Sequence, residues 1–109
     1  MEKAMEEKIR ELQLLEQNLQ QAMMQRQNFQ GRLMEIDNAL EELEKNPKEV
    51  YRIVGPIMVK TNKIDVEKDL NSKKEVVSLR INNVEKNENK LKEKAKNLQE
   101  EVMKGLKDE

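Results

Sequence analysis

Residues that could carry out covalent chemistry are scarce in this chain of 109 residues, and those present are mainly carboxylates and amines. The sequence has no His and no Cys, so it offers no imidazole base, no thiolate nucleophile and no disulfide. It also lacks a Gly-rich loop that could hold a phosphate group. The carboxylates fall in stretches typical of solvated helix faces, where no cleft would perturb their pKa values. We therefore expect no enzyme, no cofactor and no metal site.

Charge and composition restrict the kind of binding that remains. The net charge of −1 argues against a nucleic-acid partner or an anionic membrane. Lys90, Lys92, Lys94 and Lys96 spread around a helix, so a helical arm for RNA would lack its basic face. No segment approaches the ~18 apolar residues of a membrane span. The polar start, MEKAMEEKIR, does not read as a secretory signal, so we expect a soluble, cytoplasmic protein.

The stretch VYRIVGPIMVK, residues 50–60, is the exception in a chain rich in charged residues. It reads as two strands, 50–54 and 57–61, joined by Gly55-Pro56 in a type II′ turn. Alternation predicts one face with Val50, Arg52, Val54, Ile57, Val59 and Thr61, and another with Tyr51, Ile53, Met58 and Lys60. Both faces are largely apolar, which favours binding over solvation.

Heptad spacing predicts a long helix on each side of this hairpin, because apolar residues recur alternately three and four apart. In the first helix, Arg26 interrupts the apolar row. In the second, Lys74 and Glu88 do so. The expected seam consists of Leu15, Leu19, Ala22, Phe29, Leu33, Ile36, Leu40, Leu43, Leu70, Val77, Ile81, Val84, Leu91 and Ala95. Met23 and Met24 should pack at its flank.

The fold class predicted is mainly α: a long antiparallel two-helix coiled coil with one β-hairpin between the helices. We expect a single domain, 1–109, with a helix over about 4–45, the hairpin over about 49–62 and a helix over about 66–106. Asn46-Pro47 should end the first helix, and Asp65 is the expected N-cap of the second. Folding the chain about Gly55 places Arg26 opposite Glu88, where they can pair or both reach water.

A lone two-stranded hairpin is marginally stable and has two open edges. The hairpins of several chains should therefore assemble, by joining strands into a shared barrel. The alternative is that the hairpin folds down onto its own helices, which would still leave one apolar face uncovered.

The order helix, hairpin, helix resembles the β-class subunits of the prefoldin family. The match includes the Gln-rich first helix, LLEQNLQQAMMQRQNFQGRLMEIDNALEELEK, the hairpin, and VVSLRINNVEKNENKLKEKAKNLQEE in the second helix. The segment Gly55-Pro56-Ile57-Met58-Val59-Lys60 looks more like the eukaryotic subunit six than the archaeal β subunit. A single hairpin argues against the α class, whose members carry two.

The resemblance implies a hexameric co-chaperone of two α-type and four β-type subunits that works without ATP. Hairpin residues Val50, Tyr51, Ile53, Val54, Gly55, Pro56, Ile57, Met58 and Val59 would build its barrel. The helix ends would hold unfolded clients such as actin and tubulin and pass them to a cytosolic group II chaperonin. The expected client-binding residues are Met1, Met5, Ile9, Leu12, Leu98, Val102, Met103 and Leu106, with Ile9, Met103 and Leu106 exposed off the seam.

A coiled-coil scaffold or adaptor without chaperone activity is the competing interpretation. A scaffold would form a stable homodimer through its helices and ignore unfolded protein. A prefoldin subunit should seek α-type partners, although the isolated chain can also self-associate through its hairpin.

Overall fold

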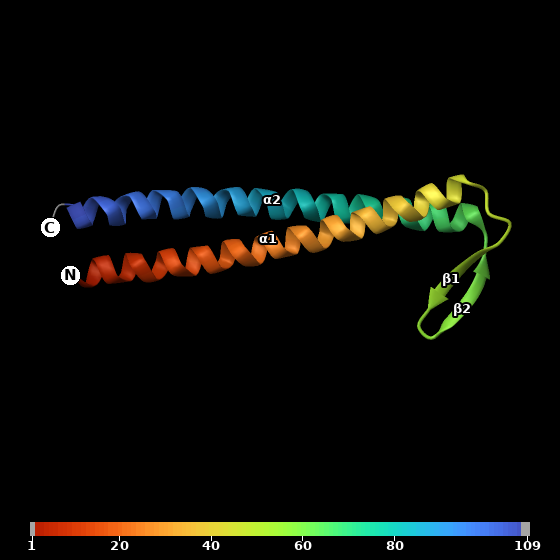
Figure 1. Cartoon of the computed structure of the whole chain (residues 1–109), viewed down its shortest axis with the longest axis horizontal. Helices are drawn as coiled ribbons and strands as arrows, with labels where there is room; N and C mark the ends of the chain where they lie inside the picture. The colour runs from red at the N-terminus through yellow and green to blue at the C-terminus, as the bar shows by residue number, and fades with distance from the viewer. Residues whose placement is uncertain (1, 108–109) are drawn as a thin grey trace. The chain divides into compact units, whose positions relative to one another are not determined.

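The computed structural model describes residues 2–107, which form two long helices with a short hairpin between them (Figure 1). Helix α1 spans Lys3–Glu44, strands β1 and β2 span Val50–Val54 and Ile57–Thr61, and helix α2 spans Lys63–Lys107. The chain divides into two compact units. Unit 1 comprises Met1–Gln27 with Asn82–Glu109, and unit 2 comprises Asn28–Ile81 with the hairpin.

Helix α1 ends where the sequence predicts a stop. Asn46 takes the left-handed conformation with φ 54°, and its backbone N–H donates to the carbonyl of Leu43 at 3.1 Å. An Asn side chain tolerates this conformation better than most, and Pro47 cannot extend the helical hydrogen bonds. The Asn46 Oδ1 also accepts a hydrogen bond from Lys63 Nζ at 2.7 Å. The end of α1 is thereby tied to the start of α2.

Helix α2 begins three residues earlier than predicted, and Asn62 rather than Asp65 is its N-cap. The Asn62 Oδ1 accepts from the backbone N–H of Asp65 at 2.9 Å, which satisfies one of the first unpaired donors of the helix. The Asn62 Nδ2 in turn donates to Asp65 Oδ2 at 2.8 Å. Asp65 therefore supports the cap from the first turn, where its negative charge complements the helix dipole.

The hairpin has the predicted register, with Val50 paired to Thr61 and Val54 to Ile57. Its turn depends on Gly55, whose φ of 58° is the left-handed value that the first position of a type II′ turn requires. The following Pro56 supplies a fixed negative φ. This pairing assigns the side chains to the two faces that alternation predicts.

The predicted seam residues are all buried or half-buried, and the most buried apolar side chains belong to it or continue its rows. These are Ala22, Leu98 and Val102 in unit 1, and Leu43, Val77 and Ile81 in unit 2. In each unit the two helix segments run antiparallel, because Lys8 pairs with Glu101 and Arg26 with Glu88 in unit 1, while Asp37 pairs with Lys74 and Asn46 with Lys63 in unit 2. Lys8 Nζ lies 3.6 Å from Glu101 Oε2 in unit 1, and Lys74 Nζ lies 2.8 Å from Asp37 Oδ1 in unit 2.

The two polar residues predicted to face each other do form an ion pair within unit 1. Arg26 Nε donates to Glu88 Oε1 at 2.5 Å. Glu88 is only 4% exposed, whereas the Arg26 side chain is 27% exposed and reaches water beside it. A buried carboxylate needs a partner of opposite charge, so any register that separates the two residues is penalised.

Gly105 leaves room for the Met5 side chain near the chain ends of unit 1. A Cβ at this position would collide with Cε of Met5. The Met5 side chain therefore lies against the α2 backbone, and Gly105 serves packing as well as weakening the last turn.

We predict that Arg26→Leu lowers the free energy of unfolding by about 3 kcal/mol, because Glu88 then stays buried without a partner. The double variant Arg26→Leu/Glu88→Leu should return to within about 1 kcal/mol of the original chain, since two apolar residues can replace a buried pair. Urea unfolding followed by circular dichroism measures both values. Equal losses in the single and double variants would show that the pair does not act as a unit.

Candidate functional site

The hairpin presents an uncovered apolar surface, which we call the hairpin surface. Ile53 and Met58 are cross-strand partners on one face and are 74% and 68% exposed. The other face is also exposed where Val54 pairs with Ile57. The hairpin surface consists of Tyr51, Ile53, Val54, Ile57, Met58 and Val59. Such a concentration of exposed apolar side chains is typical of an interaction site.

The sheet of unit 2 contains only β1 and β2 within residues 2–107, so the outer edge of each strand is left unpaired. An open edge can pair with a strand of another chain. The hairpin is not folded down onto the helices, because both of its faces are exposed. At the base of the hairpin, Arg52 Nη2 lies 3.7 Å from Asp69 Oδ2 of α2. Val50 and Thr61, also at the base, are half-buried. These contacts anchor the base and leave the apolar surface accessible.

Tyr51 is the polar member of the hairpin surface. Its hydroxyl donates a hydrogen bond to Glu49 Oε2 at 2.7 Å. The Glu49 carboxylate stabilises the protonated phenol, and this, with a small contribution from burial, raises the pKa of Tyr51 above its ordinary value. The bond also directs the ring at the start of β1.

The second predicted site comprises the chain ends within unit 1, and only part of it is exposed. Met103 is 59% exposed, and Leu106 is exposed as well. Leu98 and Val102 are buried, while Met5, Ile9 and Leu12 are half-buried. Met1 lies outside the described residues. The prediction that Ile9 is exposed was therefore wrong, because Ile9 packs half-buried beside the seam positions Lys8 and Leu12.

Met103 forms part of a shallow hollow on α2 near its end. The hollow is lined by Lys96, Gln99, Glu100, Met103, Lys104 and Lys107. A flexible thioether among long amphipathic side chains can adapt to varied apolar segments. The three lysines would favour segments that also carry acidic residues.

Several exposed apolar residues escaped the sequence prediction because they do not lie on the heptad rows. Met23 and Met24, expected at the flank of the seam, are both exposed on α1, as is Leu14. The others belong to unit 2: Met34, Ile64, Val76 and Leu79. The sequence did contain a sign of them, because each is an apolar residue at an outer heptad position, where a polar residue is expected.

Within residues 2–107, no cluster of carboxylates is arranged to hold a metal ion. No helix in this range is both long and apolar enough to cross a membrane.

Two long helices joined by a short antiparallel β-hairpin place the chain in a mainly helical class of fold. The sequence profile of the family described as "Prefoldin subunit" matches residues 6–109. Prefoldin subunit beta of Archaeoglobus fulgidus is 38% identical over 96 residues, which cover 86% of this chain and 83% of that protein. Prefoldin subunit beta of Sulfurisphaera tokodaii is 36% identical over 93 residues, which cover 84% of this chain and 74% of that protein. The chain therefore belongs to the prefoldin family.

A solved structure supports the same assignment. The crystal structure of the prefoldin beta subunit from Thermococcus strain KS-1 matches with a TM-score of 0.88 at 34% identity, over 96% of this chain and 94% of that one. The predicted family and fold class are thus confirmed. All three relatives are archaeal β subunits, and the preference for eukaryotic subunit six stays a prediction. Members of the family are chaperone subunits, not enzymes, and form complexes with other prefoldin subunits.

We predict that the phenol of Tyr51 titrates above its ordinary pKa of about 10 and that Glu49→Gln lowers its pKa. The folded chain holds the phenol proton more tightly than the unfolded chain. The stabilising contact is therefore complete below pH ~10 and is lost as pH rises through the folded pKa. Tyr51 is the only Tyr and Trp is absent, so near-UV absorbance of the phenolate reports this group alone. An unchanged titration in Glu49→Gln would contradict the assignment.

Proposed function

We propose that this chain is one subunit of an ATP-independent co-chaperone that captures non-native polypeptides and delivers them to a cytosolic group II chaperonin. The observation that carries the proposal is the hairpin surface, which is apolar on both faces and has unpaired edges. Membership of the prefoldin family supplies the context in which such a surface assembles subunits. The complex we propose is a hexamer of two α-type and four β-type subunits in the cytoplasm.

Assembly would proceed by strand addition, in which each free edge pairs with a strand of the neighbouring subunit. Backbone hydrogen bonds give such a joint its strength, and alternate side chains give it specificity. Ile53 and Met58 would then be covered by neighbouring hairpins. Because each exposed apolar side chain removed from water contributes about 1.5–3 kcal/mol, the hairpin surface can supply much of the free energy of assembly.

Client capture would use the exposed side chains near the chain ends, chiefly Met103 and Leu106. Two such residues would bind a client weakly, but several subunits in one complex raise the effective concentration of the contacts. The half-buried Met5 and Ile9 could join the surface where the helix ends fray. Actin and tubulin are the expected kind of client, as folding intermediates that expose apolar segments.

The hairpin should be essential for assembly. We predict that Ile53→Lys/Met58→Lys abolishes the complex with α-type prefoldin subunits, because two charges would have to be buried under neighbouring hairpins. Size-exclusion chromatography with light scattering gives the mass of the complex. Leu14→Lys is the matched control, since it places a charge at an exposed apolar site on α1 that is not part of the hairpin. Assembly of the hairpin variant at full mass would reject the proposal, and so would a stable homodimer that ignores α-type subunits.

The helix ends should be needed for client binding but not for assembly. We predict that Met103→Ser/Leu106→Ser leaves the mass of the complex unchanged and reduces its suppression of client aggregation several-fold. Light scattering from a chemically denatured client, with and without the chaperonin, measures the effect. Leu14→Ser again serves as the control. Equal suppression by the variant and control complexes would exclude these residues as the client site.

A further inference from the structure

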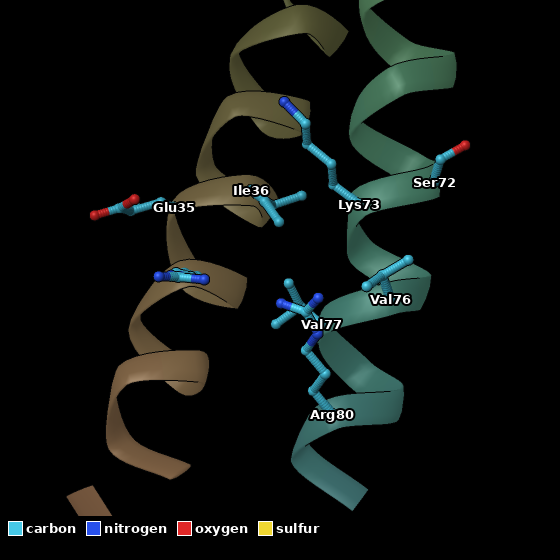
Figure 2. Close-up of a pocket in the computed structure, with 8 residues that line it drawn as sticks. Glu35, Ile36, Ser72, Lys73, Val76, Val77 and Arg80 are labelled. Atoms are coloured by element: carbon cyan, nitrogen blue, oxygen red, sulfur yellow. The ribbon is translucent and has the colours of Figure 1, made fainter. Parts of the chain in front are cut away.

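Unit 2 contains a groove that neither the hairpin nor the helix ends explain. It lies between α1 and α2, has a volume of about 410 Å³, and has Ile36, Val76 and Val77 as its apolar lining. Three cations border it, namely Arg32, Lys73 and Arg80, with Glu35 and Ser72 completing the set. Lys73 and Arg80 extend from α2 toward α1, whereas Glu35 points away from α2 (Figure 2). We call this feature the basic groove.

Two of the three cations of the basic groove lie near one aromatic ring. The guanidinium carbons of Arg32 and Arg80 lie 5.7 and 5.9 Å from the centroid of Phe29. Both distances are within the range of cation–π attraction. One ring therefore holds a guanidinium from each helix at the same level of unit 2. An occupant with acidic side chains would meet charges that are already positioned.

The other side of the same helix pair carries complementary features. Met34, Asp37, Glu41 and Glu44 are spaced three, four and three apart, which places them along one stripe of α1. Met34 is 65% exposed. We call this stripe the acidic ridge. It lies on the far side of the seam from the basic groove, because Arg32 and Met34 are two residues apart and residues at that spacing do not share a helix face.

The residues around the acidic ridge are also mainly acidic, unlike those around the basic groove. A second hollow is lined by Asp37, Leu40, Glu41, Glu44, Glu67, Asn71 and Lys74, and shares no residue with the basic groove. Lys74 is the one cation in that lining and pairs with Asp37 at 2.8 Å. Glu41 and Glu44 therefore dominate the charge of the ridge.

We propose that the basic groove receives the acidic ridge of a second copy of this chain. The exposed thioether of Met34 would enter the apolar groove over Ile36 and Val76, while Glu41 and Glu44 meet Arg32 and Arg80 at one end of it. Lys73, at the other end, already pairs with Asp69 at 3.2 Å. A second copy is the occupant favoured, because it presents an apolar side chain and acidic residues in the combination that the groove complements. The contact is head-to-tail, so it leaves one groove and one ridge available for further copies. It rests on the helices of unit 2 and does not depend on hairpin assembly.

Disulfide trapping tests this contact, since the chain has no Cys of its own. Met34→Cys and Val76→Cys chains, one of them labelled with heavy nitrogen, are mixed and oxidised mildly, and the dimers are weighed by mass spectrometry. The mixed dimer should clearly exceed its statistical share over the two same-variant dimers. Leu14→Cys mixed with Val76→Cys is the control, because it offers an equally exposed thiol outside the ridge. A statistical mixture, or an equal yield with the control, would overturn the proposal.

Charge exchange supplies an independent readout. Adding Glu41→Lys/Glu44→Lys to the Met34→Cys chain should reduce the mixed dimer several-fold. Adding Arg32→Glu/Arg80→Glu to the Val76→Cys chain should then restore it. Circular dichroism verifies that each variant stays helical. Failure of restoration with helicity intact would show that these charges do not meet.

Two further measurements distinguish this contact from hairpin assembly and from binding of an unrelated acidic partner. In chains that carry Ile53→Lys/Met58→Lys, disulfide trapping should persist even though the hairpin-mediated complex no longer forms. The groove contact and hairpin assembly can therefore be rejected independently of each other. Protection of the Val76→Cys thiol from alkylation by polyglutamate, but not by excess chain lacking Cys, would assign the groove to another acidic partner. That result would also overturn the proposal.

Discussion

The hairpin surface combines six large apolar side chains with a sheet that is two strands wide within residues 2–107. A sheet this narrow cannot bury both faces against itself, and its base is anchored to α2 through Arg52 and Asp69. Strand addition by other chains would pair the open edges, and closure of the joined strands into a barrel would cover an apolar face. Assembly is therefore the natural outcome of the fold, and membership of the prefoldin family agrees with it.

The helices present a different physical problem, because a seam built mainly from Leu, Ile, Val and Ala can slip in register. Arg26 and Glu88 reduce this freedom in unit 1, where a nearly buried carboxylate tolerates few alternative positions. Near the chain ends, the flexible Met5 side chain fills the space beside Gly105. Stability and specificity thus come from different residues of the same seam.

Away from the seam, the exposed apolar residues differ in the sign of the charged residues around them. Met103 has lysines beside it, which suits adaptable and weak contacts with varied segments. Met34 lies among acidic residues on one side of unit 2, and Val76 lies among basic residues on the other. An arrangement of this kind favours particular neighbours, because electrostatic complementarity contributes more to specificity than to affinity.

The sequence by itself determined the two helices, the Gly55 turn, the faces of the hairpin and the placement of Arg26 opposite Glu88. These features follow from heptad spacing and strand alternation, which are local periodicities. Only the tertiary structure decided that Asn62 caps α2, that Ile9 is half-buried, and that Phe29 lies near both Arg32 and Arg80. Those outcomes depend on the rotation and separation of helices far apart in the sequence. Packing sets these quantities, and no periodicity along the chain encodes them.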